Sequence, residues 1–341
     1  MTLTSEWRLV PASEFGRHLQ AWDRVAAGSR SSPLNEAAFI GALLRVFGRG
    51  DEVLAICGDP IAPHAMCVLR PSGAGVWEAF QASQGPLSAW VHRSGLSYED
   101  LLPSLVKALP GMPLVVSITQ KDPDIHSRPK DSSKLKTLDY VQTARVVVNR
   151  PFEDYWQARD KKVKYEIRRR LKRLSEIGIE PRLELLRDPG EVAAAVEAYG
   201  SIEGSGWKGE AGTAVHGDNE QGLFYRTVLS DYCARGKGRI YRYWFGDQVV
   251  AMQMCIEDAR TLVFLKTAYD ERHARYAPGI LMKYAIFEQA FREGKLERIE
   301  FYGALLEWQR KWIDEVRTMY HVTYYRWTWL PNMQELRRAA A

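Results

Sequence analysis

A carboxylate and a phenol stand two residues apart near the end of the chain and could together move protons. Glu300 and Tyr302 lie in the run Arg-Ile-Glu-Phe-Tyr, whose β-branched and aromatic content predicts a strand over residues 298–302. Alternate residues of a strand share a face, so the two side chains would point the same way. Such a pair suits a general base and a general acid. It equally suits a surface carboxylate beside a capping aromatic ring, and both interpretations stay open.

A lysine lies inside an apolar run that also predicts a strand. Lys266 follows Phe264 and Leu265. An ammonium removed from water needs a partner. Lys266 therefore either binds a carboxylate or phosphate of a substrate or forms an ion pair with Asp270 or Glu300. The sequence does not separate these alternatives.

The elements that would position these residues follow in a clear order in the second half of the chain. Strands separated by tight turns are followed by a loop, a helix, a short strand, a second helix and a last aromatic strand. The expected ranges are 239–245, 248–256, 261–268, 269–278, 279–292, 298–302, 306–316 and 321–330. The helix after the third strand is a crossover to a parallel neighbour. This order predicts an α+β fold of GNAT topology.

The loop before the crossover helix is a candidate anion site. Pro278 and Gly279 open the helix, where a missing N–H costs nothing and a missing side chain lets a phosphate approach closely. Free N–H groups and the helix dipole at this end suit a pyrophosphate. A Pro-Gly pair can also do no more than begin a helix.

The first half repeats the same order more faintly. A helix is expected over 36–47, strands over 53–57, 65–69 and 76–80, a helix over 98–109 and a strand over 114–119, with a loop at 120–137. We therefore predict two tandem GNAT-like domains, a degenerate one over residues 1–150 and a second over 151–341. The second begins with a basic helix that has a narrow apolar stripe and ends at Gly178.

The stretch K-T-A-Y-D-E-R-H-A-R-Y-A-P-G-I-L, residues 266–281, resembles the GNAT-like family typified by the CelD cellulose-biosynthesis proteins, which is related to the FemAB peptidyltransferases. The resemblance covers roughly residues 152–325 and includes the arginine-rich helix. It implies transfer of an acyl group from acetyl-CoA or another acyl-CoA to an amine or hydroxyl, without a metal. Catalytic candidates are then Glu300, Tyr302 and Lys266.

The same resemblance implies binding residues. The expected donor-binding residues surround the start of the crossover helix and are Tyr276, Ala277, Pro278, Gly279 and Ile280. The chain departs from the family pattern further on, where Arg310 or Lys311 replaces a displaced lysine as a contact for the donor's phosphates. Residues expected on the acceptor side are Trp207, Tyr269 and Asp270, although Trp207 could equally plug a domain interface.

Composition limits the rival functions. The formal charge is +5, but residues 159–173 carry nine Lys and Arg against two acids, so the rest of the chain is near −2. Four scattered cysteines with no adjacent histidines predict reduced thiols and no metal site. No run of 18 apolar residues and no secretory signal is present, so we expect a cytoplasmic protein without a membrane span.

Three functions remain open at this stage. The first is an acyl-CoA-dependent N-acyltransferase acting on a small molecule or a precursor of envelope or exopolysaccharide. The second is a FemAB-like transferase whose donor is aminoacyl-tRNA, with the basic helix guiding its phosphates. The third is a non-catalytic scaffold or nucleic-acid-binding GNAT relative. Because the basic helix has few of the interleaved aromatic residues expected for stacking on single strands, nucleic acid is the less favoured partner.

Overall fold

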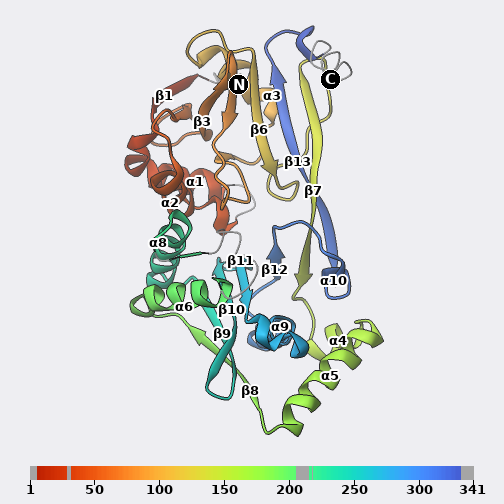
Figure 1. Ribbon diagram of the computed structural model, residues 1–341. Helices are drawn as coiled ribbons and strands as arrows, with labels where there is room; N and C mark the ends of the chain where they lie inside the picture. The colour runs from red at the N-terminus through yellow and green to blue at the C-terminus, as the bar shows by residue number, and fades with distance from the viewer. Residues whose placement is uncertain (1–5, 29–31, 205–214, 217, 332–341) are drawn as a thin grey trace. The chain divides into compact units, whose positions relative to one another are not determined.

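The computed structural model describes residues 6–28, 32–204, 215–216 and 218–331 (Figure 1). The chain forms two compact units: Met1–Gln142 together with Arg317–Ala341, and Thr143–Val316. The predicted boundary at residue 150 therefore differs from the observed division, because the last strand belongs with the first unit. Within the described residues, no helix combines the length and the apolar character needed to cross a membrane.

Unit 1 is an antiparallel meander followed by a crossover to a parallel strand. Its strands lie in the order β1-β2-β3-β4-β6-β13, and β5 also pairs with β3. The crossover helix is α3, and β4 and β6 are parallel. The elements are β1 (Trp7–Pro11), α1 (Leu19–Ala27), α2 (Ala37–Phe47), β2 (Val53–Cys57), β3 (Ala65–Gly73), β4 (Val76–Ala79), β5 (Trp90–His92), α3 (Tyr98–Ala108), β6 (Val115–Lys121) and β13 (Glu315–Tyr325).

Unit 2 repeats this plan, with strands in the order β7-β12-β11-β10-β9-β8. The parallel pair is β11 with β12, joined by α9. Its elements are β7 (Leu135–Val147), α4 (Phe152–Gln157), α5 (Lys161–Glu176), β8 (Pro181–Leu186), α6 (Val192–Gly204), α8 (Glu220–Ala234), β9 (Gly238–Phe245), β10 (Gln248–Glu257), β11 (Thr261–Tyr269), α9 (Pro278–Glu293), β12 (Arg298–Phe301) and α10 (Glu307–Arg310).

The repeated order confirms the predicted tandem GNAT fold. In each half a meander of strands leads through one helix to a parallel strand, and then to a long last strand. The end of β7 pairs with β12 in the sheet of unit 2. Strand β13, which follows unit 2 in the chain, pairs with β6 in the sheet of unit 1. Residues 298–301 of β12 thus lie between β11 and the segment of β7 that starts at Ala144.

The main core of unit 2 lies on the face of the sheet covered by α4, α5 and α9, whereas α6 and α8 pack on the other face (Figure 1). Helix α5 has the apolar stripe predicted for it, with Val163, Ile167 and Leu174 buried. Its basic residues fill the remaining faces. The hydrophobic effect thus anchors this helix through few residues and leaves most of its charges outside the core.

The prediction of a helix over residues 306–316 was wrong beyond Arg310. Helix α10 ends there, and Glu315 begins β13, six residues before the predicted strand. Trp308 and Trp312 at i and i+4 imitate a helical stripe. Asp314 nevertheless accepts hydrogen bonds from the Val147 amide at 2.9 Å and from Arg159 at 2.8 Å, which fixes this segment against β7 and α4. Tertiary hydrogen bonds therefore override the local pattern.

Candidate active site of the second unit

The two parallel strands of unit 2 separate partway along their length. Pairing between β11 and β12 runs from Thr261 with Arg298 to Phe264 with Phe301, and β11 then continues to Tyr269 beside β10 alone. A bulge starts the separation, because Met254 faces Lys266 while Cys255 faces Phe264, and Leu265 has no opposite residue. The β12 side of residues 265–269 is therefore an open strand edge, where backbone groups can meet a ligand.

Helix α9 begins just beyond this open edge. Ala277 takes a left-handed conformation with φ 50° and ψ 59°, Pro278 occupies the first turn, and no side chain caps the end. The first turn holds no acidic residue, and the helix is 16 residues long. Pro278 has no N–H, and the amides of Ala277 and Ile280 donate to backbone carbonyls, so this helix start offers an anion the Gly279 N–H and the helix dipole.

A buried carboxylate, that of Asp270, holds the loop between β11 and α9. Asp270 accepts hydrogen bonds from the Arg272 amide at 3.0 Å, from the Arg272 guanidinium at 2.8 Å and from Gln248 at 3.0 Å. The Arg272 hydrogen bond lowers the pKa of Asp270. Tyr276 is buried against Phe245, with ring centroids 6.1 Å apart. Asp270 and Tyr276 thus hold the loop.

Tyr269 is the member of the predicted acceptor-side group that reaches this helix start. Its ring is about half exposed, and a β-carbon added to Gly279 would lie 3.4 Å from it. Pro278 and Gly279 are themselves buried. Tyr269 and Gly279 therefore lie against each other at the start of α9, and the donor-binding role of residues 276–280 stays a prediction.

A cavity of about 200 Å³ lies beside the first turn of α9. Ile280 contributes from α9, and Lys162, Glu166 and Arg170 contribute from one side of α5. The remaining wall is formed by Trp308, Lys311 and Trp312, with Val163 and Ile167 at the base. Three cations and one carboxylate thus surround a small space next to an uncapped helix start, and Arg170 pairs with Glu166 at 3.2 Å. The surplus of positive charge is suited to phosphate.

Of the two cations that the sequence proposed for donor phosphates, only Lys311 lines this cavity. Arg310 is half exposed and pairs with Glu307 at 3.3 Å. Lys162 and Arg170 were missed as individual residues, although the basic helix was noted. Their positions flank the apolar stripe at i, i+4 and i+8 with Glu166, and a helical-wheel plot would have placed them at the edge of the packed face.

Lys266 has charged and polar partners on α6 and α8. Its ammonium lies 3.0 Å from Gln221 and 3.6 Å from Glu203, and 5.8 Å from the centre of the Tyr225 ring. Glu203 is buried and also accepts a hydrogen bond from the Val215 amide at 2.8 Å. The ion pair that the sequence considered is therefore formed, but with Glu203 in place of Asp270 or Glu300.

Glu300 is buried in the sheet opposite an arginine. It lies across from Arg145 of β7, at 3.5 Å, and Arg145 also donates to Glu315 at 2.6 Å. Tyr302 follows the last residue of β12 and is half buried. Since it lies beyond the strand, the two-residue period does not place it on the face of Glu300.

A second lysine near the site was missed by the sequence analysis. Lys283 lies one turn into α9, is 7% exposed, and its ammonium is 5.1 Å from the centre of the Trp308 ring. Burial lowers the pKa of Lys283 to about 8. The Trp308 side chain thus lines the cavity and also lies next to the buried Lys283 ammonium. A lysine within a helical apolar pattern gives no sequence signal that distinguishes it from an exposed one.

Trp207, predicted on the acceptor side, lies outside the described residues. The nearest described segments are the end of α6 and residues 215–216. In the ranges that the structure does describe, no group of three or more His, Cys, Asp or Glu is arranged to hold a metal. The four cysteines are buried and reduced.

In unit 1, the gap between the strands and the start of the crossover helix are both occupied by the protein's own side chains. The Lys121 ammonium donates to the Trp90 carbonyl at 3.2 Å, and the Ser88 hydroxyl donates to the Thr119 carbonyl at 2.6 Å, so side chains bridge the gap between β5 and β6. The start of α3 carries a capping box in which Ser97 and Asp100 bind each other's backbone N–H. An anion is therefore not favoured at α3.

Residues 161–310 match the family described as Acetyltransferase (GNAT) domain. A search of curated proteins gives no match. The narrower resemblance to CelD proteins stays a sequence prediction.

Solved structures share the fold over nearly the whole chain. The C-terminal domain of a putative lysylphosphatidylglycerol synthetase from Agrobacterium fabrum aligns with a TM-score of 0.57 and 14% identity, over 94% of this chain and 96% of that one. FemX aligns with 0.58 and 8% identity over 96% and 99%. L-PGS from Bacillus licheniformis aligns with 0.52 and 14% over 93% and 95%. The chain is thus a tandem GNAT-fold protein whose second unit carries the match to the acetyltransferase domain.

Proposed function

We propose that unit 2 transfers an acyl group from an acyl-CoA thioester to an amine or hydroxyl. The observation that carries the proposal is the uncapped start of α9, which lies at the open edge of β11 beside the cavity formed by Lys162, Arg170 and Lys311. The pyrophosphate would bind at the helix start, with these cations around it. The pantetheine arm would then extend along the open edge of β11.

The chemistry needs few side chains. The acceptor's nitrogen or oxygen attacks the thioester carbonyl, a β11 backbone N–H stabilises the oxyanion, and the carbon–sulfur bond breaks as the tetrahedral intermediate collapses. A base takes the acceptor's proton, and an acid protonates the leaving thiolate. Tyr302, which follows β12 where the strands have separated, is the best-placed proton donor. Glu300 and Lys266 would act as positioning residues through Arg145 and Glu203.

A thermal-shift titration tests the donor. Saturating CoA should raise the melting temperature, since a ligand that binds only the folded state adds roughly 2.7 kcal/mol at about 100 times its Kd. Inorganic phosphate at the same concentration serves as the control for non-specific ion effects. No shift at millimolar CoA would overturn the proposal.

One observation favours a second candidate, an aminoacyl-tRNA donor. Arg168, Lys172 and Arg173 are exposed on α5, away from the cavity. The FemAB relatives suggested by the sequence use aminoacyl-tRNA, and one matched structure is named for synthesis of lysylphosphatidylglycerol. Mass spectrometry of ligands that copurify separates the two: CoA supports the first proposal, and tRNA the second. The acceptor, proposed as a small molecule or a glycan precursor, is to be sought only after the donor is known.

A further inference from the structure

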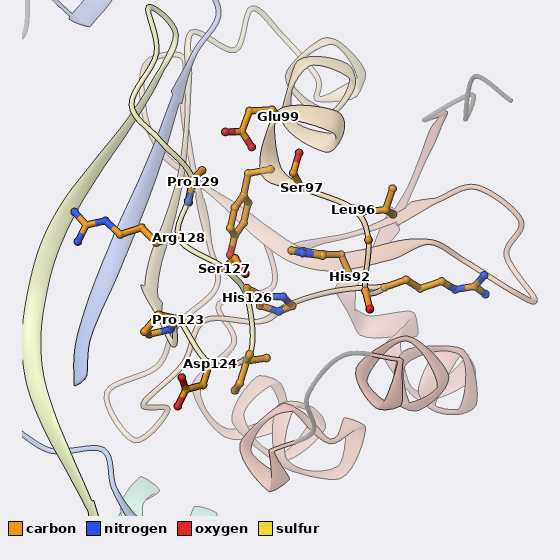
Figure 2. Close-up of a pocket in the computed structure, with 15 residues that line it drawn as sticks. His92, Leu96, Ser97, Glu99, Pro123, Asp124, His126, Ser127, Arg128 and Pro129 are labelled. Carbon is orange, nitrogen blue, oxygen red and sulfur yellow. The ribbon is translucent and has the colours of Figure 1, made fainter. Parts of the chain in front are cut away.

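Unit 1 has a cavity of its own, of about 530 Å³, at the place that corresponds to the donor site of unit 2 (Figure 2). One wall is the loop from β5 into α3, which carries His92, Ser94 and Ser97. The other is the loop after β6, which carries Asp124, His126 and Arg128. These loops occupy the same positions in the repeat as the loops before α9 and after β12. The cavity is therefore where the fold places ligands, although the anion site of unit 1 is closed.

Two histidines lie side by side in this cavity. Their ring centroids are 4.1 Å apart and the ring planes are inclined by 31°. Figure 2 shows His92 and His126 next to each other. Trp90 donates its indole N–H to Nδ1 of His92 at 2.8 Å, so Nε2 of His92 carries the hydrogen and is a donor. His126 is only 2% exposed, and its Nε2 is buried without a hydrogen-bond partner among the described residues. A buried polar atom without a partner is costly and indicates an absent ligand or water.

Both rings stay uncharged near neutral pH. Burial, with help from Lys121, lowers the pKa of His92 to about 4 and the pKa of His126 well below its usual value. Lys121 is itself buried, and its pKa falls to about 7. Arg128 is occupied by Asp139 and by the Thr137 hydroxyl. The two rings thus offer neutral hydrogen-bonding groups, in a cavity whose lining also carries both acidic and basic side chains: Arg93, Glu99, Asp124 and Arg128.

The position of His126 is fixed by its surroundings. Arg317 forms a buried two-pronged pair with Asp122, at 3.0 and 2.8 Å, and Asp122 begins the turn that ends at His126. The Tyr320 hydroxyl donates to the His126 carbonyl at 2.7 Å. A ring held by a buried ion pair and a buried hydroxyl needs little rearrangement to bind a ligand.

We propose that this cavity binds a neutral ligand rich in hydroxyl groups, such as a sugar or polyol, through His92 and His126. A hydroxyl accepts the hydrogen of His92 Nε2 and can either donate to or accept from His126 Nε2, so it satisfies either tautomer of His126. Two neighbouring hydroxyls on one ligand would engage the two rings together. This site is separate from the proposed acyl-transfer site and rests on that proposal only for the correspondence of the two positions in the repeat.

The test uses the full chain and a panel of neutral mono- and oligosaccharides, with inorganic phosphate and acetate as anionic comparators. Nitrogen-15 NMR of the histidine rings and the melting temperature are recorded for each. At least one saccharide should shift the His92 and His126 resonances saturably and raise the melting temperature, whereas phosphate and acetate should change neither.

The variant His126→Phe keeps a ring beside His92 but removes the nitrogen without a partner. Its melting temperature without ligand should stay equal or rise, and the saccharide effect should disappear. His18→Gln, at a half-buried position outside the cavity, should behave as the parent protein. A panel in which no saccharide moves either histidine, an anion that moves both, or a saccharide effect that survives in His126→Phe would each overturn the proposal.

Discussion

The two sides of helix α5 should respond differently to loss of charge. Lys162 and Arg170 line the cavity beside the α9 start, whereas Arg168 and Lys172 are exposed away from it. The double variant Lys162→Gln with Arg170→Gln should weaken CoA binding strongly. The matched double variant Arg168→Gln with Lys172→Gln removes the same charge from the same helix, and it should leave CoA binding nearly unchanged.

The size of the effect follows from the number of contacts. A hydrogen bond to a charged group contributes about 1.5–3 kcal/mol when shielded from water, and partial exposure of these side chains reduces this to about 1–2 kcal/mol each. Two lost contacts then amount to about 2–4 kcal/mol, or roughly a 30- to 700-fold higher Kd. The solvent-facing pair should change Kd by about twofold or less, because exposed charges are well screened.

Calorimetric titration with CoA and with pantetheine provides the assay. Pantetheine lacks the phosphates, so its affinity should be the same in the parent protein and in both double variants. The variant pair that weakens CoA should raise KM with little change in kcat, because phosphate binding is equal in ground and transition states. The reasoning fails if both double variants weaken CoA alike, or if the cavity-facing pair weakens pantetheine as much as CoA.

Three further predictions concern single residues. Gly279→Val should abolish measurable CoA binding while changing the melting temperature little, because its side chain would press on the Tyr269 ring at the helix start; unchanged titrations would place the phosphates elsewhere. Burial holds the pKa of Lys283 at about 8 in the folded protein, below the 10.5 that is usual for lysine, so urea unfolding of the parent should show stability rising from pH 8 to 10.5. Lys283→Met should be more stable than the parent by about 3 kcal/mol below pH 8 and should not show this rise. The parent should lose stability as pH falls from 6.5 to 4, because His92 protonates over this range only in the unfolded chain. In His92→Phe about 3 kcal/mol of that loss should vanish, even though Trp90 loses its hydrogen-bond acceptor. An unaltered dependence of stability on pH would refute the assignment.

The sequence predicted the second meander well because each strand there is long, apolar and bounded by turn residues. The observed bounds of β9, β10, β11 and α9 lie within one residue of the predicted ones. It missed β7, which begins at Leu135 within the predicted loop, because the exposed middle of the strand, which includes Leu138 and Tyr140, has no buried face to give an alternating pattern. The end of β7 pairs with β12, more than 150 positions away, and local pattern carries no trace of that pairing.

The prediction of site residues was likewise limited to features that depend on neighbouring residues in the chain. The start of α9 could be found because Pro278 and Gly279 act through the backbone, and backbone signals are local. The partners of Lys266 could not be found, since Glu203 and Gln221 come from two helices separated by residues outside the described ranges. The acceptor-side role of Asp270 stays a prediction, and its pairing with Arg272 depends on a turn that the sequence does not specify.

The contrast between α3 and α9 explains why one fold repeated twice should carry its donor site only once. Both helices follow the meander and lead to a parallel strand, so both have an N-terminal dipole directed at the same place in the repeat. At α3, Asp100 places a carboxylate on the free N–H groups, and Lys121 spans the strands where a thioester would lie. At α9, Pro278 has no N–H to satisfy, and no side chain caps the helix start, where the Gly279 N–H lies. An anion at α3 would have to displace the Asp100 carboxylate and leave it unpaired, so an anion is disfavoured there. We therefore assign the neutral ligand to unit 1 and the phosphate site to unit 2.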